Sequence, residues 1–249
     1  MRSSTAGLLI AKGPTVRTTS RSTLLGWLAG SVKRRSRRLA DGMFASTDAP
    51  CRSSVAFDIV AFGTRCPDDE VQVFVHRSLY DILELSFDQA GIGWHSVQRE
   101  DRGDGALVVL PAGKPPELLV GPLVLALATF LRRYNKLVSD AAQIRLRMAV
   151  HSGPVYSDAN GVVGRSLVHL FRMLEAPTFK DAMKVSEAAL GVVASERLYR
   201  DVIEPAEDVL SIGPFEPIEV DVKETHSPAW MAMHGDQPTE ALLGLSKTA

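Results

Sequence analysis

The pattern of apolar and polar positions changes at Arg52. Before it, residues 1–50 are rich in serine, threonine, arginine and glycine and show no sustained apolar period. Such a segment buries too little apolar surface to offset the entropy lost on ordering, so we expect it to be disordered. After it, apolar residues recur at strand and helix spacings, which predicts a folded domain over residues 51–235. We expect residues 236–249 to be disordered as well.

The first half of the expected domain has the pattern of a strand, a long helix and a β-hairpin. Asp and Gly residues between these elements supply the helix cap and the turn. The expected elements are a strand over Ser54–Phe62, a helix capped by Asp68 or Asp69 and running through Gln89, and strands over Trp94–Arg99 and Ala106–Leu110 on either side of the turn Asp101–Gly105.

The second half completes the fold class. Its expected elements are a helix over Glu117–Val138, a strand over Ile144–Val155, helices over Gly164–Glu175 and Thr178–Val185, a strand over Leu190–Ala194, a helix over Glu196–Ile203 capped by Ser195, and strands over Glu216–Val222 and Pro228–Met233. The strand Ile144–Val155 begins with strict alternation, which is typical of a half-buried strand. The order β-α-β-β-α-β predicts a ferredoxin-like α+β domain, extended by a C-terminal helix and hairpin.

Charge is distributed unevenly along the 249 residues. Nine Lys or Arg and two Asp lie in residues 1–50, which leaves 19 basic and 27 acidic residues, a net charge of −8, in the rest of the chain. The basic run Lys33–Arg38 is most simply a solvated tail, although its charges would also attract nucleic acid or an anionic membrane. Translation from Met43 would remove this run altogether.

The two cysteines, Cys51 and Cys66, lack the C-x-x-C spacing of a zinc or redox site. They form no disulfide framework either, so we expect a reducing, cytoplasmic location. No apolar run reaches the roughly 18 residues of a membrane-spanning helix. The best candidate, Leu118–Leu131, is interrupted by Gly121 and Pro122.

Asp58 and Asp104 are candidate metal ligands. Asp58 lies inside an apolar strand, where a carboxylate needs a cation or hydrogen-bond donors. Asp104 lies at a Gly-Asp-Gly turn, where the glycines permit close backbone approach. If the two strands are neighbours, the carboxylates converge, and such hard oxygen donors suit Mg²⁺ or Mn²⁺. The alternatives are that Asp58 pairs with an arginine and that Asp104 only shapes the turn.

Five short segments occur in a fixed order between residues 53 and 233. They are Phe57–Gly63 (FDIVAFG), Glu100–Gly105 (EDRGDG), Arg147–Val155 (RMAVHSGPV), Gly164–Met173 (GRSLVHLFRM) and Val222-Lys223. In this order they resemble the motifs of class III adenylate and guanylate cyclases: two metal motifs, the R-x-G-x-H-x-G-x-V strand, the G-x-x-V-N-x-A-x-R-[ML] helix and the V-K-G hairpin. The runs E-D-R-G-D-G and V-K-E-T-H-S-P-A-W resemble a bacterial, largely actinomycete, branch.

This resemblance implies a reaction and a set of site residues. A nucleoside triphosphate would be converted to a 3′,5′-cyclic mononucleotide and pyrophosphate, with two Mg²⁺ or Mn²⁺ ions per site. The implied metal ligands are Asp58, Ile59 and Asp104; the implied catalytic cations are Arg172 and Lys223; and the implied substrate contacts are Phe62, Gly63, Thr64, Glu100, Gly103, Gly161 and Val168. The alternatives are that Arg172 forms an ordinary surface ion pair with Glu175 and that Lys223 is a solvated hairpin residue.

The resemblance also implies a head-to-tail homodimer, in which the aspartates of one subunit face the base reader, arginine and lysine of the other. Glu100 stands at the first base-reading position, where a carboxylate favours guanine over adenine. Gly161 stands at the second and has no side chain, so the base is left open between GTP, ATP, UTP and CTP. Bacterial antiphage cyclases that make cyclic UMP or cyclic CMP belong to the same superfamily.

One position departs from the family pattern. Val168 stands where the family has a ribose-orienting asparagine, and a valine side chain cannot hydrogen-bond. His169 is the next residue, but it points about 100° away around the helix. Two functions therefore compete: an active cyclase, and a catalytically silent cyclase-homology domain that dimerises or senses nucleotide. We expect His151 to be a core histidine.

Overall fold

The computed structural model describes residues 49–66, 68–206, 210 and 213–235. The expectations for the basic tail, for its run Lys33–Arg38 and for the C-terminal residues 236–249 lie outside the described residues. Within the described part of the chain, no helix is long and apolar enough to cross a membrane.

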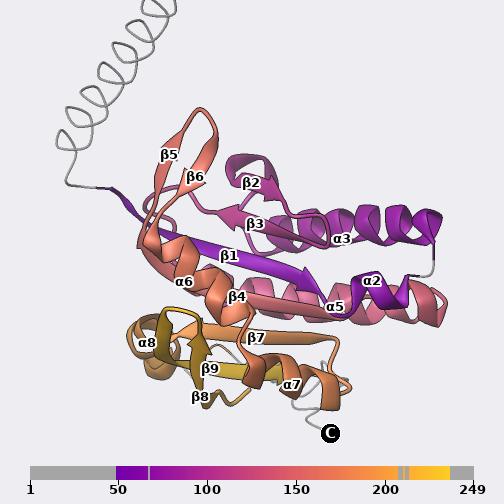
Figure 1. Cartoon of the computed structure of the whole chain (residues 1–249). Coiled ribbons are helices and arrows are strands. Elements are labelled where there is room, and N and C mark those ends of the chain that lie inside the picture. The colour runs from indigo at the N-terminus through magenta and orange to yellow at the C-terminus, as the bar shows by residue number, and fades with distance from the viewer. Residues whose placement is uncertain (1–48, 67, 207–209, 211–212, 236–249) are drawn as a thin grey trace, which may run out of the picture. The chain divides into compact units, whose positions relative to one another are not determined.

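Seven strands form one mixed sheet in the order β2-β3-β1-β4-β7-β9-β8 (Figure 1). They are β1 (Cys51–Ile59), β2 (Gln98–Asp101), β3 (Gly105–Val109), β4 (Leu146–Pro154), β7 (Leu190–Ser195), β8 (Glu216–Val222) and β9 (Thr225–His234). All neighbours pair antiparallel except β4 and β7. The order β2-β3-β1-β4 is the ferredoxin-like arrangement, and β7, β9 and β8 extend it, so the predicted fold class is confirmed.

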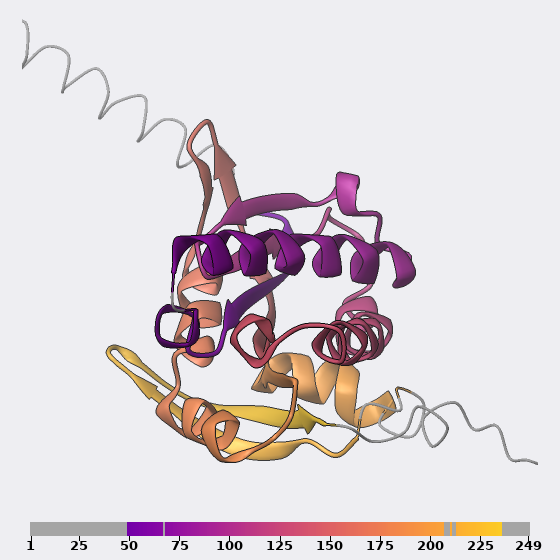
Figure 2. The same cartoon turned by 90° about the vertical axis from the view of Figure 1, so that its right-hand side faces the viewer.

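Helices cover both faces of this sheet. The longer ones are α3 (Asp69–Gln89) and α5 (Pro122–Asn135) on one face, and α6 (Arg165–Leu174) and α7 (Pro177–Val185) on the other (Figures 1 and 2). Alternation along β1 divides the two cores, because Phe57 packs on the α3–α5 face and Ala56 on the α6–α7 face. Asp58 is two residues beyond Ala56 and therefore lies on the α6–α7 face.

Short elements connect these layers. They are α2 (Phe62–Arg65), η1 (Trp94–Ser96), α4 (Glu117–Val120), η2 (Asp140–Ala142), α8 (Glu196–Leu198), η3 (Tyr199–Ile203), η4 (Glu204–Ala206) and a separate hairpin of β5 (Tyr156–Asp158) and β6 (Gly161–Val163). The β5–β6 hairpin projects from the end of the fold nearest β2 (Figures 1 and 2).

Several expected element boundaries were wrong. The single helix expected over Glu117–Val138 is two helices, broken at Gly121 because the following proline cannot donate a helical hydrogen bond. The strand expected over Trp94–Arg99 begins with a 3₁₀ turn. The strand expected to be half-buried, β4, is central and is buried on both faces over Leu146–Val150.

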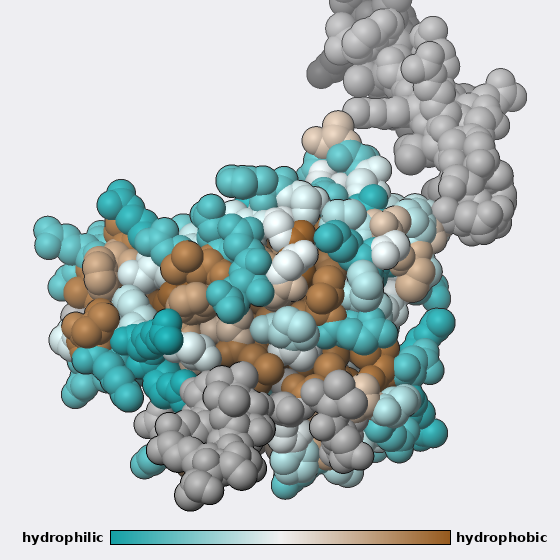
Figure 3. Space-filling view, turned by 180° about the vertical axis from the view of Figure 1, so that it is seen from behind, coloured by the Kyte–Doolittle hydropathy of each residue, from teal (hydrophilic) through white to brown (hydrophobic). Residues whose placement is uncertain are grey.

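The α3–α5 face is the side seen in Figure 3, where hydrophobic residues lie among hydrophilic ones. On α3 the large apolar side chains exposed to solvent are Val73, Phe74 and Leu85. The candidate site side chains of the five cyclase-like segments lie elsewhere. They are on the α6–α7 face of the sheet and in the turns at the ends of the strands.

Candidate functional site

Strand pairing brings Asp58 and Asp104 to neighbouring positions. Asp58 is opposite Gly105 in the β1–β3 register, and the backbone N–H of Ile59 donates to the carbonyl oxygen of Asp104 at 2.8 Å. Residue 105 has to be glycine here, since a Cβ would overlap the carbonyl oxygen of Phe57. The expected adjacency of the two strands is therefore present.

The turn that carries Asp104 is stabilised by its own residues. Asp101 Oδ1 accepts a hydrogen bond from the N–H of Gly103 at 2.8 Å, and Gly103 has a φ of +81°. This hydrogen bond, assisted by His76 on α3, lowers the pKa of Asp101. The metal hairpin expected from sequence is thus a formed turn, and Gly103 is required for its backbone conformation.

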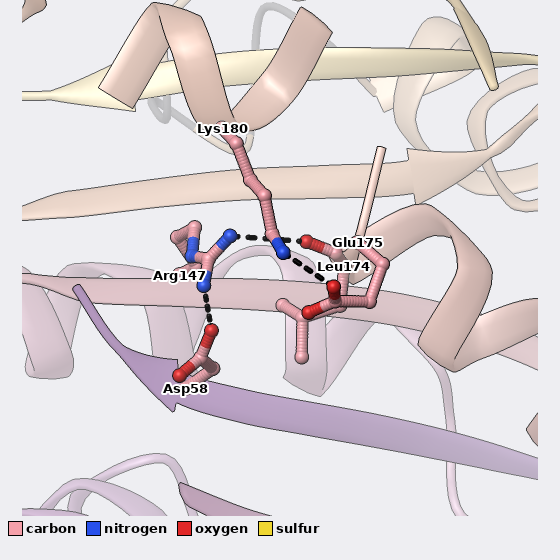
Figure 4. Close-up of polar contacts among 5 residues, drawn as sticks. All are labelled: Asp58, Arg147, Leu174, Glu175 and Lys180. Atoms are coloured by element: carbon pink, nitrogen blue, oxygen red, sulfur yellow. Dashed lines mark hydrogen bonds and ion pairs between the residues drawn. The ribbon is translucent and has the colours of Figure 1, made fainter. Parts of the chain in front are cut away.

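Asp58 forms a buried ion pair with Arg147 of β4 (Figure 4). Their side chains are only 13% and 10% exposed, and the guanidinium also donates to the carbonyl oxygen of Leu174 at 3.4 Å. Burial lowers the pKa of Arg147, and nearby Glu175 opposes that shift. The alternative that Asp58 pairs with an arginine is therefore realised for one of its carboxylate oxygens.

The available donors fit a hard divalent cation. The second carboxylate oxygen of Asp58, the carboxylate of Asp104 and the carbonyl oxygen of Ile59 are the ligand types that Mg²⁺ and Mn²⁺ prefer. Among the described residues, no group of three or more His, Cys, Asp or Glu side chains could hold a metal ion. A cation here would need further oxygen ligands, which substrate phosphates commonly supply.

The residues expected to cradle phosphate form the short helix α2, directly after β1. The N–H groups of Thr64 and Arg65 donate to the carbonyl oxygen of Ala61, at 3.1 and 2.9 Å. The first N–H groups of a helix have no acceptor inside the helix, so those of Phe62 and Gly63 are the ones suited to an anion. The hydroxyl of Thr64 also donates to Ala61.

Arg172 lies against the turn that carries Lys223. Arg172 of α6 donates from Nε and Nη2 to Glu224 Oε1, at 3.3 and 2.9 Å, and Glu224 follows Lys223 in the two-residue turn between β8 and β9. The expected alternative partner of Arg172, Glu175, instead pairs with Lys180 (Figure 4). Lys223 has a φ of +55°, a conformation that favours glycine.

The two expected base-reading positions are in direct contact. The N–H of Val162 donates to Glu100 Oε1 at 2.9 Å, and Arg102 Nη2 donates to Glu100 Oε2 at 2.6 Å. Gly161 has a φ of +128°, and a Cβ there would overlap Glu100 Oε1. Residue 161 therefore favours glycine for its backbone conformation, and the absence of a side chain leaves room for the carboxylate of Glu100.

Val168 is 46% exposed on α6 and leaves the expected asparagine position without a hydrogen-bonding group. The ring of His169 packs on that of His151, with centroids 4.9 Å apart. His151 Nδ1 lies 2.9 Å from the hydroxyl of Ser195, and burial lowers the pKa of His151 to about 4. The sequence predicted that Ser195 caps the following helix, but its side chain makes no capping hydrogen bond there. Its hydroxyl contacts His151 instead.

Sequence reasoning gave no role to Arg147, Arg102 or Glu224. Arg147 was detectable, because Arg145 and Arg147 lie in a largely apolar predicted strand, and an arginine buried there needs a partner. Glu224 and Arg102 stand beside residues of the expected site, but their ion pairs depend on tertiary contacts or turn geometry. No periodic pattern marks them.

Comparisons with known proteins agree with this architecture. No model of a known protein family and no curated protein matches the chain. An adenylate/guanylate cyclase/hydrolase from Silicibacter pomeroyi matches with a TM-score of 0.51 and 15% identity, over 74% of this chain and 96% of its own. The guanylyl cyclase Cya2 matches with a TM-score of 0.50 and 18% identity, over 74% of this chain and 91% of its own. The chain has the fold of adenylate/guanylate cyclase domains.

Proposed function

We propose that this protein is a metal-dependent nucleotidyl cyclase that works as a homodimer and produces a cyclic mononucleotide for signalling. The observation that carries the proposal is the strand pairing that sets Asp58 beside Asp104, at the end of β1 that leads into α2. The cyclase-like fold and the order of the five sequence segments support it.

Asp58, Asp104 and the carbonyl group of Ile59 would hold Mg²⁺ or Mn²⁺, two ions per site. When bound, such ions lower the pKa of a coordinated hydroxyl and neutralise phosphate charge. Arg147 would orient the carboxylate of Asp58, because the ion pair holds one of its oxygens and leaves the other available to a metal ion.

The reaction joins two atoms of one substrate. The ribose 3′-oxygen forms a bond to the α-phosphorus, the bond from that phosphorus to pyrophosphate breaks, and the hydroxyl proton passes to solvent. Arg172 would stabilise the charge that develops on the α-phosphate oxygens, and Lys223 would contact the β- and γ-phosphates. Arg172 would exchange the carboxylate of Glu224 for phosphate when substrate binds.

A homodimer explains why the site residues fall into two groups. Asp58 and Asp104 lie at the end of β1, whereas Arg172 and Lys223 lie where α6 meets the β8–β9 turn. In the proposed head-to-tail dimer, each site takes the aspartates of one copy and the arginine and lysine of the other. A twofold axis then makes two equivalent sites.

The competing function is a catalytically silent domain that dimerises or senses nucleotide. It is favoured by Val168, whose side chain cannot orient a ribose, and by Arg147 and Arg172, which already have carboxylate partners. A nucleotide-sensing domain would bind a nucleoside triphosphate and leave it intact.

The test is incubation of the purified full chain with Mn²⁺ and ATP, GTP, UTP or CTP, with products identified by mass. We expect a cyclic mononucleotide from at least one of them and none from the Asp104→Ala variant. Absence of any cyclic product from the wild-type protein would refute the proposed cyclase activity. Nucleotide binding without product would support the catalytically silent, nucleotide-sensing domain.

A further inference from the structure

Arg102 is fixed between the metal hairpin and helix α6. Its Nη2 donates to Glu100 Oε2 at 2.6 Å, and its guanidinium lies 5.2 Å from the ring centroid of Phe171, the residue before Arg172. The side chain is still 44% exposed. A guanidinium has five N–H donors, so Arg102 keeps donors beyond the one that Glu100 engages.

Both carboxylate oxygens of Glu100 accept hydrogen bonds from this chain, whereas a residue that reads the base would offer them to the nucleobase. One carboxylate oxygen accepts from the backbone of Val162 and the other from Arg102, and the side chain is 24% exposed. The glycine at 161 leaves the space that this arrangement needs. Glu100 therefore links β2 to the β5–β6 hairpin and orients Arg102.

We propose that Arg102, and not Glu100, contacts the nucleobase, and that the substrate base is one that carries a carbonyl oxygen. This inference rests on the proposed function and names the substrate class of that site. Glu100 is then a positioning residue, and Phe171 supports one side of the guanidinium.

The chemistry of the four bases separates them at such a site. Guanine presents O6 and N7 as paired acceptors to an arginine, and cytosine and uracil also carry carbonyl oxygens. Adenine has an amino group where guanine has O6, so an arginine donor meets another donor. A good arginine–base pair discriminates by roughly 5- to 150-fold, and we expect at least about tenfold weaker binding of adenine nucleotides.

The test measures binding without turnover. The full chain with Mn²⁺ is titrated calorimetrically with the α,β-methylene analogues of GTP, CTP, UTP and ATP, in which the bond broken by cyclisation is replaced by P–C–P. We expect the ATP analogue to bind about tenfold more weakly than the best of the other three. The other three arms identify which carbonyl base is preferred.

Variants assign the preference to a side chain. Arg102→Leu is expected to bring the preferred analogue to the affinity of the ATP analogue, and Arg102→Lys to keep part of the difference. Glu100→Gln keeps an acceptor for Val162 and should retain most of the preference, whereas a direct guanine contact by Glu100 would make this variant lose it. Arg133→Leu, an exposed arginine on α5 at the other face of the sheet, is the matched control.

The outcomes separate the two proposals. Equal affinity for all four analogues, or an equal loss for all four in Arg102→Leu, would overturn the role of Arg102 while the nucleotide site stands. Failure of every analogue to bind the wild-type chain would overturn the nucleotide site itself, and the role of Arg102 with it. Thermal unfolding of each variant confirms that the comparison is made on folded protein.

Discussion

Asp58 and Arg147 are directly opposite each other on β1 and β4 and form an ion pair that is about nine-tenths buried. The strands also place Asp58 beside the turn that holds Asp104. One carboxylate therefore has two tasks, to neutralise a buried arginine and to serve the proposed metal site. Asp104 is exposed and has only the second task.

This difference predicts that replacing the two aspartates by alanine changes the free energy of unfolding by different amounts. Asp58→Ala leaves the charge of Arg147 buried without its partner and should lower the free energy of unfolding by about 3–5 kcal/mol. Asp104→Ala should lower it by less than about 0.5 kcal/mol, because the residue is exposed. Urea unfolding measures both values, and equal losses would contradict the assignment.

Acidification should destabilise the fold through two histidines. Burial lowers the pKa of both His151 and His234 to about 4, below the 6.5 of an unfolded histidine. Between these values the unfolded chain binds more protons than the folded one, so stability is complete above about pH 6.5 and falls as the pH drops towards 4. Protonation of each histidine lowers the free energy of unfolding by on the order of 3 kcal/mol in all. Unfolding curves at pH 7, 5.5 and 4.5 test this, and His151→Gln should flatten the dependence.

Glu224→Gln should strengthen triphosphate binding. The substitution removes a negative charge beside Lys223 and frees Arg172 from an ion pair that competes with phosphate. Because the carboxylate is exposed, we expect only a roughly two- to fivefold lower dissociation constant for an α,β-methylene nucleotide. Asp221→Gln, in β8 of the same hairpin, is the control for a general change in charge. Weaker binding by Glu224→Gln would show that the pair organises the site instead of competing for it.

Val168→Asn should raise turnover. The valine is half exposed on α6, so an asparagine fits without burying its amide and restores a group that can orient the ribose. Misplaced reacting atoms cost on the order of a hundredfold in rate, which sets the largest gain to expect. Val163→Asn, at an exposed valine on β6, is the matched control. An unchanged kcat in Val168→Asn would show that ribose orientation comes from elsewhere.

Local signals were sufficient for much of the fold. Asp68, one of the two predicted caps, accepts from the N–H of Val71 at 2.9 Å at the start of α3, and β8 has the predicted bounds Glu216–Val222. Caps and periodicity depend on neighbouring residues, so they can be recognised in a single sequence. The β5–β6 hairpin was missed because its strands are only three residues long.

The candidate site was harder to predict because its contacts span long distances in sequence. The partners Asp58 and Arg147 are 89 residues apart, and Arg172 and Glu224 are 52 apart. Gly161 appeared from sequence to be a missing base reader, but its positive φ and the carboxylate of Glu100 beside it account for the glycine. Such pairings follow from strand register and helix packing, which an individual motif does not encode.

The most direct test of the shared site is complementation between two inactive chains. Asp104→Ala and Arg172→Ala are each expected to be inactive alone, and their mixed dimer holds one intact site, with the aspartate from one chain and the arginine from the other. After unfolding and refolding together at equal amounts, statistical pairing predicts about a quarter of the wild-type rate of cyclic nucleotide formation. A mixture that stays inactive, while wild-type chains treated in the same way are active, would contradict the account.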